Sequence, residues 1–303
     1  MIINKYPLVT VVIPTFNSSS FINRAIDSVI NQTYKNWEII VVDNYSTDGT
    51  HSAVKDINDL RIRFFSIKNG GVIAKSRNFG VRNSKGEWIA FLDADDWWAP
   101  EKLGECIKLI DDNVDIIYHK CELIKNKKYS LRKKYIKSWE MKTPKFLELI
   151  VKGNPIVTSS VLVRRKIIEH INYMNESVEM VGAEDYNTWL RISRVTENFS
   201  YISTNLGYYL SHAHSVSQKD MSNPIKSATM EFIGDLGEYQ KNILNARIEY
   251  KKGRYNFQIG NYDVAKKSLL FAIKNGEKTI YIKSIVLLLA AHLNLLKNQL
   301  GKK

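Results

Sequence analysis

Cysteine, proline and long apolar runs are all scarce in this chain of 303 residues. The two cysteines, Cys106 and Cys121, cannot build a disulfide framework and match no zinc-binding spacing. Six prolines and fifteen glycines exclude a collagen-like or low-complexity chain, and 11% aromatic residues argue against disorder. We therefore expect a folded protein with a sizeable core, and not a secreted protein cross-linked by disulfide bonds.

Targeting and membrane-spanning segments are also missing from the sequence. The N-terminus lacks the basic flank, apolar stretch and small-residue cleavage site that together mark a secretory signal. The most apolar run, residues 285–293, is far shorter than the ~20 residues that a membrane span needs. The sequence therefore predicts a cytoplasmic, soluble protein that can still attach to a membrane surface.

Basic residues outnumber acidic ones by 44 to 31, which gives a formal net charge of +13. A charge of this sign suggests a nucleic acid, an anionic membrane or a phosphorylated substrate as partner. The charge is unevenly distributed: residues 1–120 have a net charge of −1, whereas residues 121–170 have +9 and residues 224–303 have +8. The basic character therefore belongs to two later segments.

The first half of the chain alternates apolar, β-branched runs with helical patterns. Strands are expected at residues 9–13, 37–42, 62–67 and 88–92, and helices at residues 21–31 and 71–81. Buried strands separated by helices predict an α/β fold with a mostly parallel, doubly wound sheet.

The second half is less regular. We expect strands at residues 116–118, 159–163, 199–202 and 208–210, a helix at residues 184–194, and helices alone from about residue 225. A boundary near residue 223 would separate an α/β domain, residues 1–223, from an α-helical C-terminal region, residues 224–303.

Polar side chains follow the expected strands at the edge where doubly wound sheets bind ligands. They are Thr15, Asp43 and the acidic stretch of residues 93–96 (DADD). Carboxylates this close repel one another, so a divalent cation, completed by a substrate diphosphate, would explain the stretch. The alternative is a solvated turn that caps the helix expected near Pro100. The acidic pattern alone does not decide between the two.

Five segments, taken together and in order, resemble the inverting family 2 glycosyltransferases, which have the glycosyltransferase A fold. Spread over roughly residues 8–217, they are residues 11–17 (VVIPTFN), 40–50 (IVVDNYSTDGT), 76–80 (SRNFG), 90–96 (AFLDADD) and 182–186 (GAEDY). The resemblance implies that residues 1–223 form a nucleotide-sugar-binding catalytic domain with a Rossmann-like, mostly parallel sheet.

The resemblance also implies roles for the side chains at the strand ends. Thr15 and Asp43 would bind the uracil of a UDP-sugar, and Arg77 would lie beside the base. Asp93 would lie near the ribose and the metal, and Asp95 would bind Mn²⁺ or Mg²⁺ directly. The plainer alternatives are that Asp43 only caps a helix and that Arg77 only forms a surface ion pair.

Asp185, at the start of an expected helix, is the candidate general base. A carboxylate there would take the proton of an acceptor hydroxyl as it attacks the anomeric carbon, and one such step inverts the anomeric configuration. Glu184 is the alternative base, although a role as first-turn helix charge is favoured for it. The resemblance also implies a histidine near the metal or the diphosphate, and His212 is favoured over His214. The arginine usual in that segment is Leu210 here.

The basic segments each allow two interpretations. Residues 125–137 form either a solvated loop or a surface that docks on anionic lipid headgroups, with aromatic side chains at the interface. Residues 249–276 resemble one tetratricopeptide-like helical hairpin, which must pack against something else because a single repeat is not stable alone. The apolar segment 283–297 is expected to be a core helix that covers the hairpin, and the alternative is an interfacial membrane helix.

The sequence thus predicts a metal-dependent, inverting transferase that moves a sugar from a UDP-sugar to a hydroxyl of a glycan acceptor. The acceptor is expected on a polyprenyl diphosphate, in the synthesis of a surface polysaccharide such as O-antigen or capsule, at the inner face of an anionic membrane. The glutamine–x–x–arginine–tryptophan segment of processive members is absent, so we expect one sugar per encounter. The alternative, a basic nucleic-acid-binding or scaffold protein, is disfavoured because the strongest motif is acidic, and we expect no nucleic-acid partner.

Overall fold

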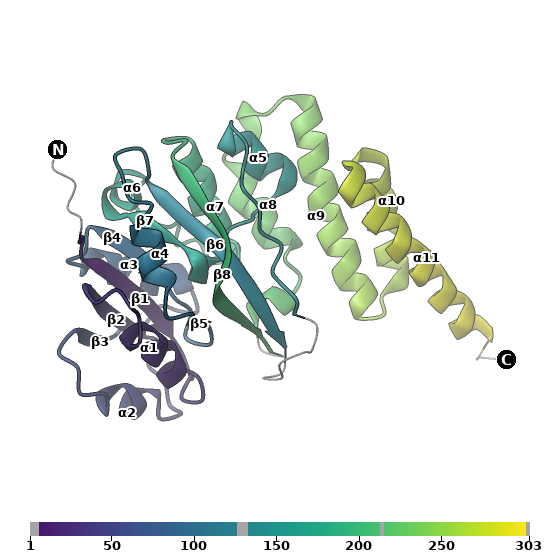
Figure 1. Cartoon of the computed structure of the whole chain (residues 1–303). Coiled ribbons are helices and arrows are strands. Elements are labelled where there is room, and N and C mark those ends of the chain that lie inside the picture. The colour runs from purple at the N-terminus through teal and green to yellow at the C-terminus, as the bar shows by residue number, and fades with distance from the viewer. Residues whose placement is uncertain (1–5, 126–132, 213–214, 301–303) are drawn as a thin grey trace. The chain divides into compact units, whose positions relative to one another are not determined.

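The computed structural model describes residues 6–125, 133–212 and 215–300 (Figure 1). The chain divides into two compact units, Met1–Leu149 with Gly153–Ala213, and Ile150–Lys152 with His214–Lys303. The domain boundary expected near residue 223 stays a prediction. Most of the basic segment 125–137, namely residues 126–132, lies outside the described residues, and so does His214.

A mixed sheet of eight strands forms the centre of the first unit in the described part of the chain, in the order β3-β2-β1-β4-β7-β6-β8-β5. The strands are β1 (Val9–Thr15), β2 (Trp37–Asp43), β3 (Ile62–Ser66), β4 (Trp88–Phe91), β5 (Trp97–Trp98), β6 (Ile116–Lys125), β7 (Leu162–Arg164) and β8 (Phe199–Ser211). The first four strands pair in parallel, β6 and β8 are also parallel, and β7 and β5 pair antiparallel to their neighbours. The expected α/β class with a mostly parallel sheet and a helical C-terminal region is confirmed.

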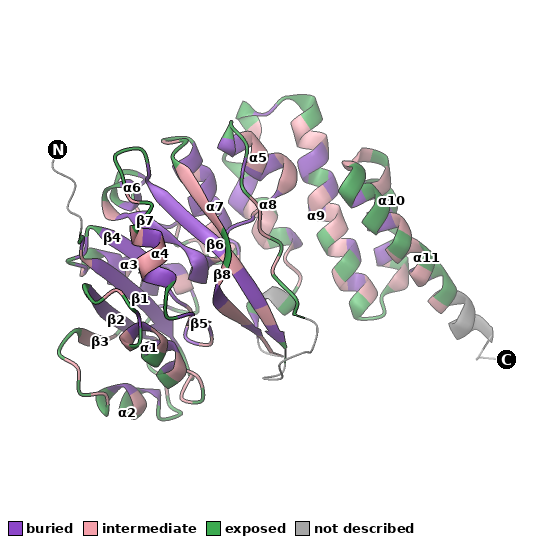
Figure 2. Ribbon diagram, viewed as in Figure 1, coloured by how far each residue is buried: buried purple, intermediate pink, exposed green. Residues whose placement is uncertain are grey.

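Helices follow the strands at short intervals. They are α1 (Ile22–Ile30), α2 (Thr50–Lys55), α3 (Ile73–Arg82), α4 (Lys102–Ile107), α5 (Lys145–Lys152), α6 (Arg165–His170) and α7 (Glu184–Ser193). In α1 the buried residues recur every three or four positions, at Ile22, Ala25, Ile26 and Val29, and belong to the same core cluster as β1 and β2. Every residue of β1 and β2 is buried, which Figure 2 shows as a continuous layer.

Helix α3 packs closely on β1 at Gly80. A Cβ atom at this position would collide with the side chain of Val12. Only glycine permits this approach without a shift of strand or helix. Since Arg77 lies on the same helix three residues earlier, the contact at Gly80 also fixes the helix that carries Arg77.

Two strand predictions differ from the structure in extent. The two short strands expected at residues 199–202 and 208–210 are one strand, β8, whose pairing with β6 shifts register around Lys120. The strand expected at residues 159–163 begins only at Leu162, because Thr158–Ser160 form a short 3₁₀ helix, η1. This difference matters because η1 contributes side chains to the candidate site.

The second unit is helical. Its helices are α8 (Ser222–Met230), α9 (Glu238–Gln258), α10 (Tyr262–Asn275) and α11 (Lys278–Leu300). Helices α9 and α10 approach closely, since a Cβ atom at Gly253 would lie 2.9 Å from Cγ of Leu269. Among residues 6–125, 133–212 and 215–300, none of the helices combines the length and apolarity that crossing a bilayer requires.

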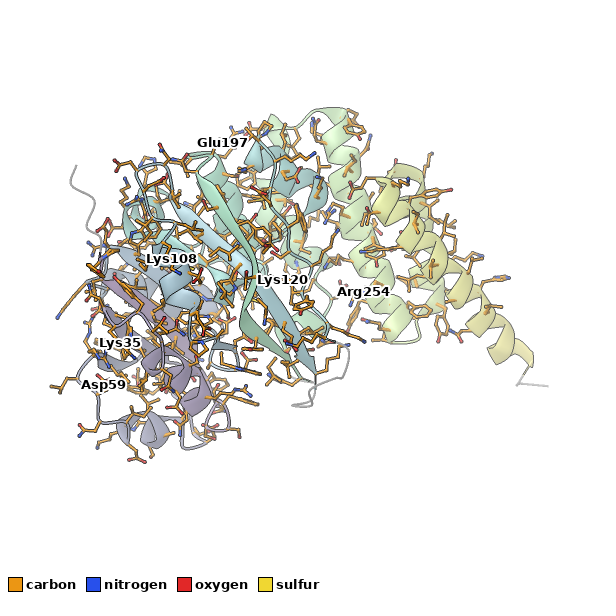
Figure 3. The ribbon with its side chains drawn as sticks, in the orientation of Figure 1. Lys35, Asp59, Lys108, Lys120, Glu197 and Arg254 are labelled. Atoms are coloured by element: carbon orange, nitrogen blue, oxygen red, sulfur yellow. The ribbon has the colours of Figure 1, made fainter. Side chains whose placement is uncertain are left out.

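Charged side chains lie on the outside of both units. Lys35 and Lys108 are exposed on the first unit and Arg254 on the second (Figure 3). Buried charges are the exception, so each of them needs a partner or a function.

Candidate active site

Strands β1 and β2 bring Thr15 and Asp43 together at their carboxyl ends. The two residues are partners in the parallel register, and both are buried. Asp43 accepts hydrogen bonds from the backbone N–H of Ser46, at 2.8 Å, and from the Ser46 hydroxyl. The buried hydroxyl of Thr15 has no hydrogen-bond partner among the residues that the structure describes. An unpaired buried hydroxyl is costly, so Thr15 Oγ1 is a candidate ligand-binding atom.

The loops that follow β1 and β2 are bonded to each other. The N–H of Asn17 donates to Ser46 Oγ at 2.8 Å, and the N–H of Thr47 donates to Asn17 Oδ1 at 2.9 Å. Asn17 and Tyr45 both have positive φ angles, of 48° and 56°. Non-glycine residues adopt this conformation at a cost of about 1 kcal/mol or more, and such strain concentrates at binding sites. These hydrogen bonds fix the positions of the two strand ends relative to each other.

Arg77 is a buried cation that joins two carboxylates from distant parts of the chain. Its Nη2 donates to Asp93 Oδ1 at 2.6 Å, and its Nη1 donates to Glu184 Oε1 at 2.7 Å. Burial opposes the charge on Arg77, but the adjacent carboxylates of Asp93 and Glu184 outweigh it and raise the pKa of the guanidinium. The ion pair is therefore buried and not a surface contact. The expected contact of Arg77 with a nucleotide base stays a prediction.

The last carboxylate of the acidic stretch points into the protein. Asp96 is 1% exposed and accepts hydrogen bonds from Ser159 Oγ at 2.6 Å and from the backbone N–H of Leu210 at 2.9 Å. Burial, followed by the charges of Asp95 and Asp93, raises the pKa of Asp96 well above its ordinary value. Asp96 thus ties the end of β4 to η1 and β8.

Asp95 and His212 form the part of the site best suited to a metal ion. Asp95 Oδ2 and His212 Nε2 lie 2.9 Å apart, and the imidazole stacks on Phe21 with ring centroids 5.5 Å apart. Burial and the charge of Asp93 raise the pKa of Asp95, so an added cation would relieve the crowding of negative charge.

The donor set fits a divalent cation only in part. A carboxylate oxygen and an imidazole nitrogen are both ligands for Mn²⁺. No group of three or more His, Cys, Asp or Glu side chains in the described part of the chain is arranged to hold a metal. Asp95 and His212 can therefore supply two ligands, and the others must come from substrate oxygens and water, as is usual for Mg²⁺ in phosphate sites.

Asp185 is the second residue of α7, directly after Glu184. Its Oδ2 accepts hydrogen bonds from Thr158 Oγ1 at 3.0 Å and from Asn154 Nδ2 at 3.3 Å, and its Oδ1 accepts one from the N–H of Tyr186 at 2.6 Å. Burial, followed by the charge of Glu184, raises the pKa of Asp185 to about 7. The residue keeps some exposure to solvent. A carboxylate with this pKa is a suitable proton acceptor at neutral pH.

Sequence reasoning missed three contributions to the site. Thr158 and Ser159 belong to η1, and their hydroxyls hold Asp185 and Asp96. Glu184, interpreted as first-turn helix charge, does lie in the first turn of α7, and it also pairs with Arg77. The only sequence signal was the run of hydroxyl residues at positions 158–160, directly before an apolar strand.

Most of the predicted residues lie at one edge of the sheet. In the sheet order, β1 separates β2 from β4, so Thr15, Asp43 and Asp93 follow neighbouring strands. Asp93 is joined through Arg77 to Glu184, the residue before Asp185. Asp95, which pairs with His212, follows Asp93 by two positions in the chain. The roles of these residues stay predictions.

Comparison with known proteins identifies the family. The model for "Glycosyl transferase family 2" matches residues 10–171. The UDP-Glc:alpha-D-GlcNAc-diphosphoundecaprenol beta-1,3-glucosyltransferase WfgD of Escherichia coli is 31% identical over 273 residues, which cover 89% of this chain and 98% of the relative. WfaP of Escherichia coli, with the same enzyme description, is 30% identical over 230 residues, covering 74% and 85%.

Solved structures show the same fold at lower identity. S. aureus TarS 1-349 in complex with UDP-GlcNAc has a TM-score of 0.64 at 19% identity, covering 96% of this chain and 92% of TarS. The mannosyltransferase PcManGT from Pyrobaculum calidifontis, in complex with GDP-Man and Mn²⁺, has a TM-score of 0.62 at 20% identity, covering 95% and 81%. With a family model over more than half of its length and a full-length relative at 31% identity, the chain belongs to glycosyl transferase family 2 and is a glycosyltransferase.

Proposed function

We propose that this glycosyltransferase moves one sugar at a time, with inversion, from a UDP-sugar to a hydroxyl of a lipid-diphosphate-linked glycan. The observation that carries the proposal is the series of contacts from Glu184, beside Asp185, through Arg77 to Asp93. These contacts connect the start of α7, which carries the proposed proton acceptor Asp185, to the segment after β4, which carries Asp95. The names of WfgD and WfaP, which state UDP-Glc and a GlcNAc-diphosphoundecaprenol acceptor, support both substrate classes.

The nucleotide would bind at the ends of β1 and β2. The unpaired hydroxyl of Thr15 is available to a base, and the Asp43 carboxylate accepts two bonds from Ser46 while retaining lone pairs for a ring N–H. Uracil offers both an N–H donor and carbonyl acceptors. Asp93 would lie near the ribose. Arg77, which is bonded to Asp93, would lie beside the base and hold Asp93 in position.

Asp95 and His212 would hold Mn²⁺ or Mg²⁺. Such an ion supplies positive charge to the departing diphosphate. The bonds of Arg77 to Asp93 and Glu184 hold the start of the acidic stretch against α7. The distance between Asp95, a proposed ligand of the ion, and Asp185 would therefore stay constant.

Asp185 would take the proton of the attacking hydroxyl. One base and one in-line displacement invert the anomeric configuration, and no second carboxylate nucleophile is needed. Thr158 and Asn154 both donate to Oδ2 of Asp185, which fixes the orientation of the carboxylate. These two residues are positioning residues.

The acceptor lipid implies where the enzyme works. A polyprenyl diphosphate lies in a membrane, so we infer that the enzyme associates with the inner face of an anionic membrane and contributes to a surface polysaccharide such as O-antigen or capsule. We retain residues 1–223 as the proposed catalytic domain and residues 224–303 as a helical region with one tetratricopeptide-like hairpin.

The test is transfer to a GlcNAc-diphosphate lipid from UDP-, GDP- and dTDP-sugars, each with Mn²⁺ and with a chelator. We expect product from a UDP-sugar, an inverted anomeric carbon by NMR, and loss of product with the chelator. Asp185→Asn should lower kcat by about 10²- to 10⁴-fold, the usual contribution of a general base. The matched control, Asp112→Asn, changes an exposed carboxylate and should leave kcat unchanged. Full activity of Asp185→Asn, or a retained configuration, would refute the proposed mechanism.

A further inference from the structure

Helix α11 is apolar on two opposite faces. The apolar residues Ile280 and Ala291 are buried along one side, with the polar Ser284 between them. The exposed apolar residues recur at intervals of four, three and four positions on the opposite side. They are Ile282, Val286, Leu289 and Leu293, each between 50% and 61% exposed. A helix that is hydrophobic all round is normally covered on both faces, so this exposed stripe marks a surface that meets an apolar environment.

Helix α10 carries a related face. Lys267, Leu270, Phe271 and Lys274 are all exposed and lie at i, i+3, i+4 and i+7, so two apolar side chains stand between two lysines on one side of the helix. Lysine stems can lie along an apolar layer while their ammonium groups stay at its polar boundary. This arrangement is that of an interfacial amphipathic helix.

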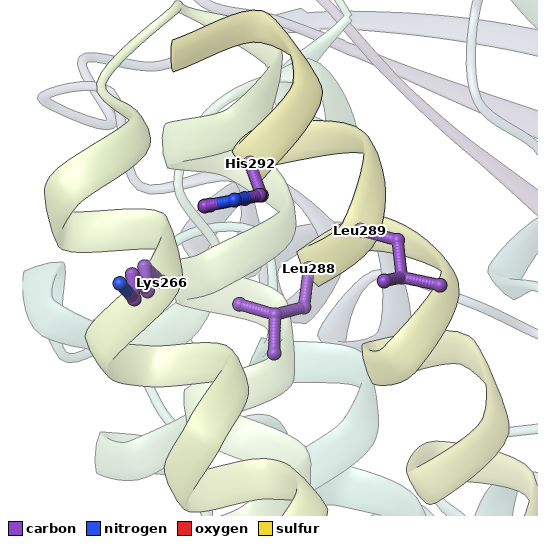
Figure 4. A pocket seen from close by; sticks show the side chains of 4 residues that line it. All are labelled: Lys266, Leu288, Leu289 and His292. Carbon is purple, nitrogen blue, oxygen red and sulfur yellow. The ribbon is translucent and has the colours of Figure 1, made fainter. Parts of the chain in front are cut away.

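A groove of about 200 Å³ connects the two helices. It is lined by Lys266 of α10 and by Leu288, Leu289 and His292 of α11 (Figure 4). Leu289 belongs both to the groove and to the exposed stripe, so the stripe borders α10. We use the name α10–α11 face for the stripe of α11 together with Lys267, Leu270, Phe271 and Lys274 of α10.

The charge of the α10–α11 face selects its partner. From Lys278 to Lys303 the sequence contains no Asp or Glu, and α10 contains only one acidic residue, Asp263. A second copy of the chain would bring lysines against lysines with few carboxylates to pair them. Anionic lipid headgroups would pair the lysines and receive the apolar stripe at the same time.

We propose that the α10–α11 face docks on an anionic lipid bilayer. The inference rests on the proposed function, because a lipid-linked acceptor requires the enzyme to reach a bilayer, and it assigns the contact to the second unit. The exposed stripe enters the headgroup boundary, and Lys267 and Lys274 contact the lipid phosphates. Each lysine near an anionic surface strengthens binding by about fivefold.

The experiment is flotation of the purified chain of 303 residues with vesicles. One set contains phosphatidylcholine alone, and the other contains phosphatidylcholine and phosphatidylglycerol in equal parts. We expect binding to the anionic vesicles only, and weaker binding at high salt. The variant Ile282→Asp/Leu289→Asp should bind at least about tenfold more weakly, because it removes two apolar contacts and adds two negative charges. The control, Ile259→Asp, changes an equally exposed apolar residue outside the α10–α11 face and should bind like the wild type.

Two further measurements separate the inference from its alternatives. Transfer to a short-chain, water-soluble acceptor should be unchanged in the double variant, so lost vesicle binding with intact transfer supports the inference. If no UDP-sugar is transferred but vesicle binding still depends on Ile282 and Leu289, the proposed function fails and the inference stands. Wild-type flotation of the double variant would overturn the inference. So would a dimer in sedimentation that the double variant dissociates, or a large fall in Tm, because the face would then cover protein.

Discussion

The pH dependence of transfer should move when Thr158 loses its hydroxyl. Thr158 Oγ1 donates to Asp185 Oδ2 at 3.0 Å, and this bond stabilises the charged carboxylate and lowers its pKa. A hydrogen bond to a charged group contributes about 1.5 kcal/mol at the low end of its range. At about 1.4 kcal/mol per pH unit, Thr158→Val should raise the pKa of Asp185 from about 7 to about 8.

The sign of the effect follows from the protonation state that the base needs. A general base acts when it is deprotonated, so kcat/KM should rise with pH through the pKa of Asp185 in the free enzyme. In the wild type this rise should be centred near pH 7. In Thr158→Val it should be centred about one unit higher, so that the ionised fraction at pH 7 falls from about one half to about one tenth.

The assay is kcat/KM for sugar transfer between pH 5.5 and about 9, within the range where the fold is expected to persist. Thr158→Ser is the matched control, because serine keeps the donor oxygen and should restore the wild-type profile. Superimposable profiles for Thr158→Val and the wild type would refute the argument that this hydroxyl lowers the pKa of Asp185. A wild-type rise centred near pH 4 would refute the raised pKa itself.

Two other substitutions test the site by methods other than turnover. A raised pKa means that the fold disfavours ionised Asp185, so stability is lost as pH rises from about 4 to about 7. Asp185→Asn should therefore be more stable than the wild type by about 2–4 kcal/mol at pH 8, after allowance for solvent contact, and equally stable near pH 4. Urea unfolding at the two pH values measures the difference in the free energy of unfolding. The same difference at both pH values would contradict the prediction. His212→Ala should weaken Mn²⁺ binding in the presence of UDP by about tenfold or more, measured as free Mn²⁺ by electron paramagnetic resonance. The control is His170→Ala, at an exposed histidine, and equal binding by both variants would exclude His212 as a ligand.

The first half of the fold could be predicted because its signals are local. Strands β1 and β2 are buried along their whole length, so they are apolar at nearly every position and cannot be mistaken for amphipathic helices. Strand β8 could not be predicted as one element. Its central residues Ser203 and Thr204 are exposed and polar, and the strand continues only because the register with β6 shifts there.

The site could be predicted in position but not in its pairings. Ligands meet sheets at the ends of strands, so Asp43 and Asp93 could be found from strand boundaries alone. One partner of Asp96 is Ser159, 63 residues away, and one partner of Arg77 is Glu184, 107 residues away. Such contacts depend on how distant segments pack, and no local pattern encodes them.

The charge of the chain and the charge of the site have opposite signs, which constrains how a diphosphate can bind. Five acidic side chains lie on the two segments that Arg77 joins, and Arg77 is already bonded to two of them. They are Asp93, Asp95, Asp96, Glu184 and Asp185. Carboxylates repel an anionic diphosphate, so positive charge added at the site would favour its binding. Under the proposed function a divalent ion at Asp95 and His212 meets this need. The excess of +8 in residues 224–303 is therefore not required by the donor, which leaves the exposed lysines of α10 and α11 to serve a different anionic partner.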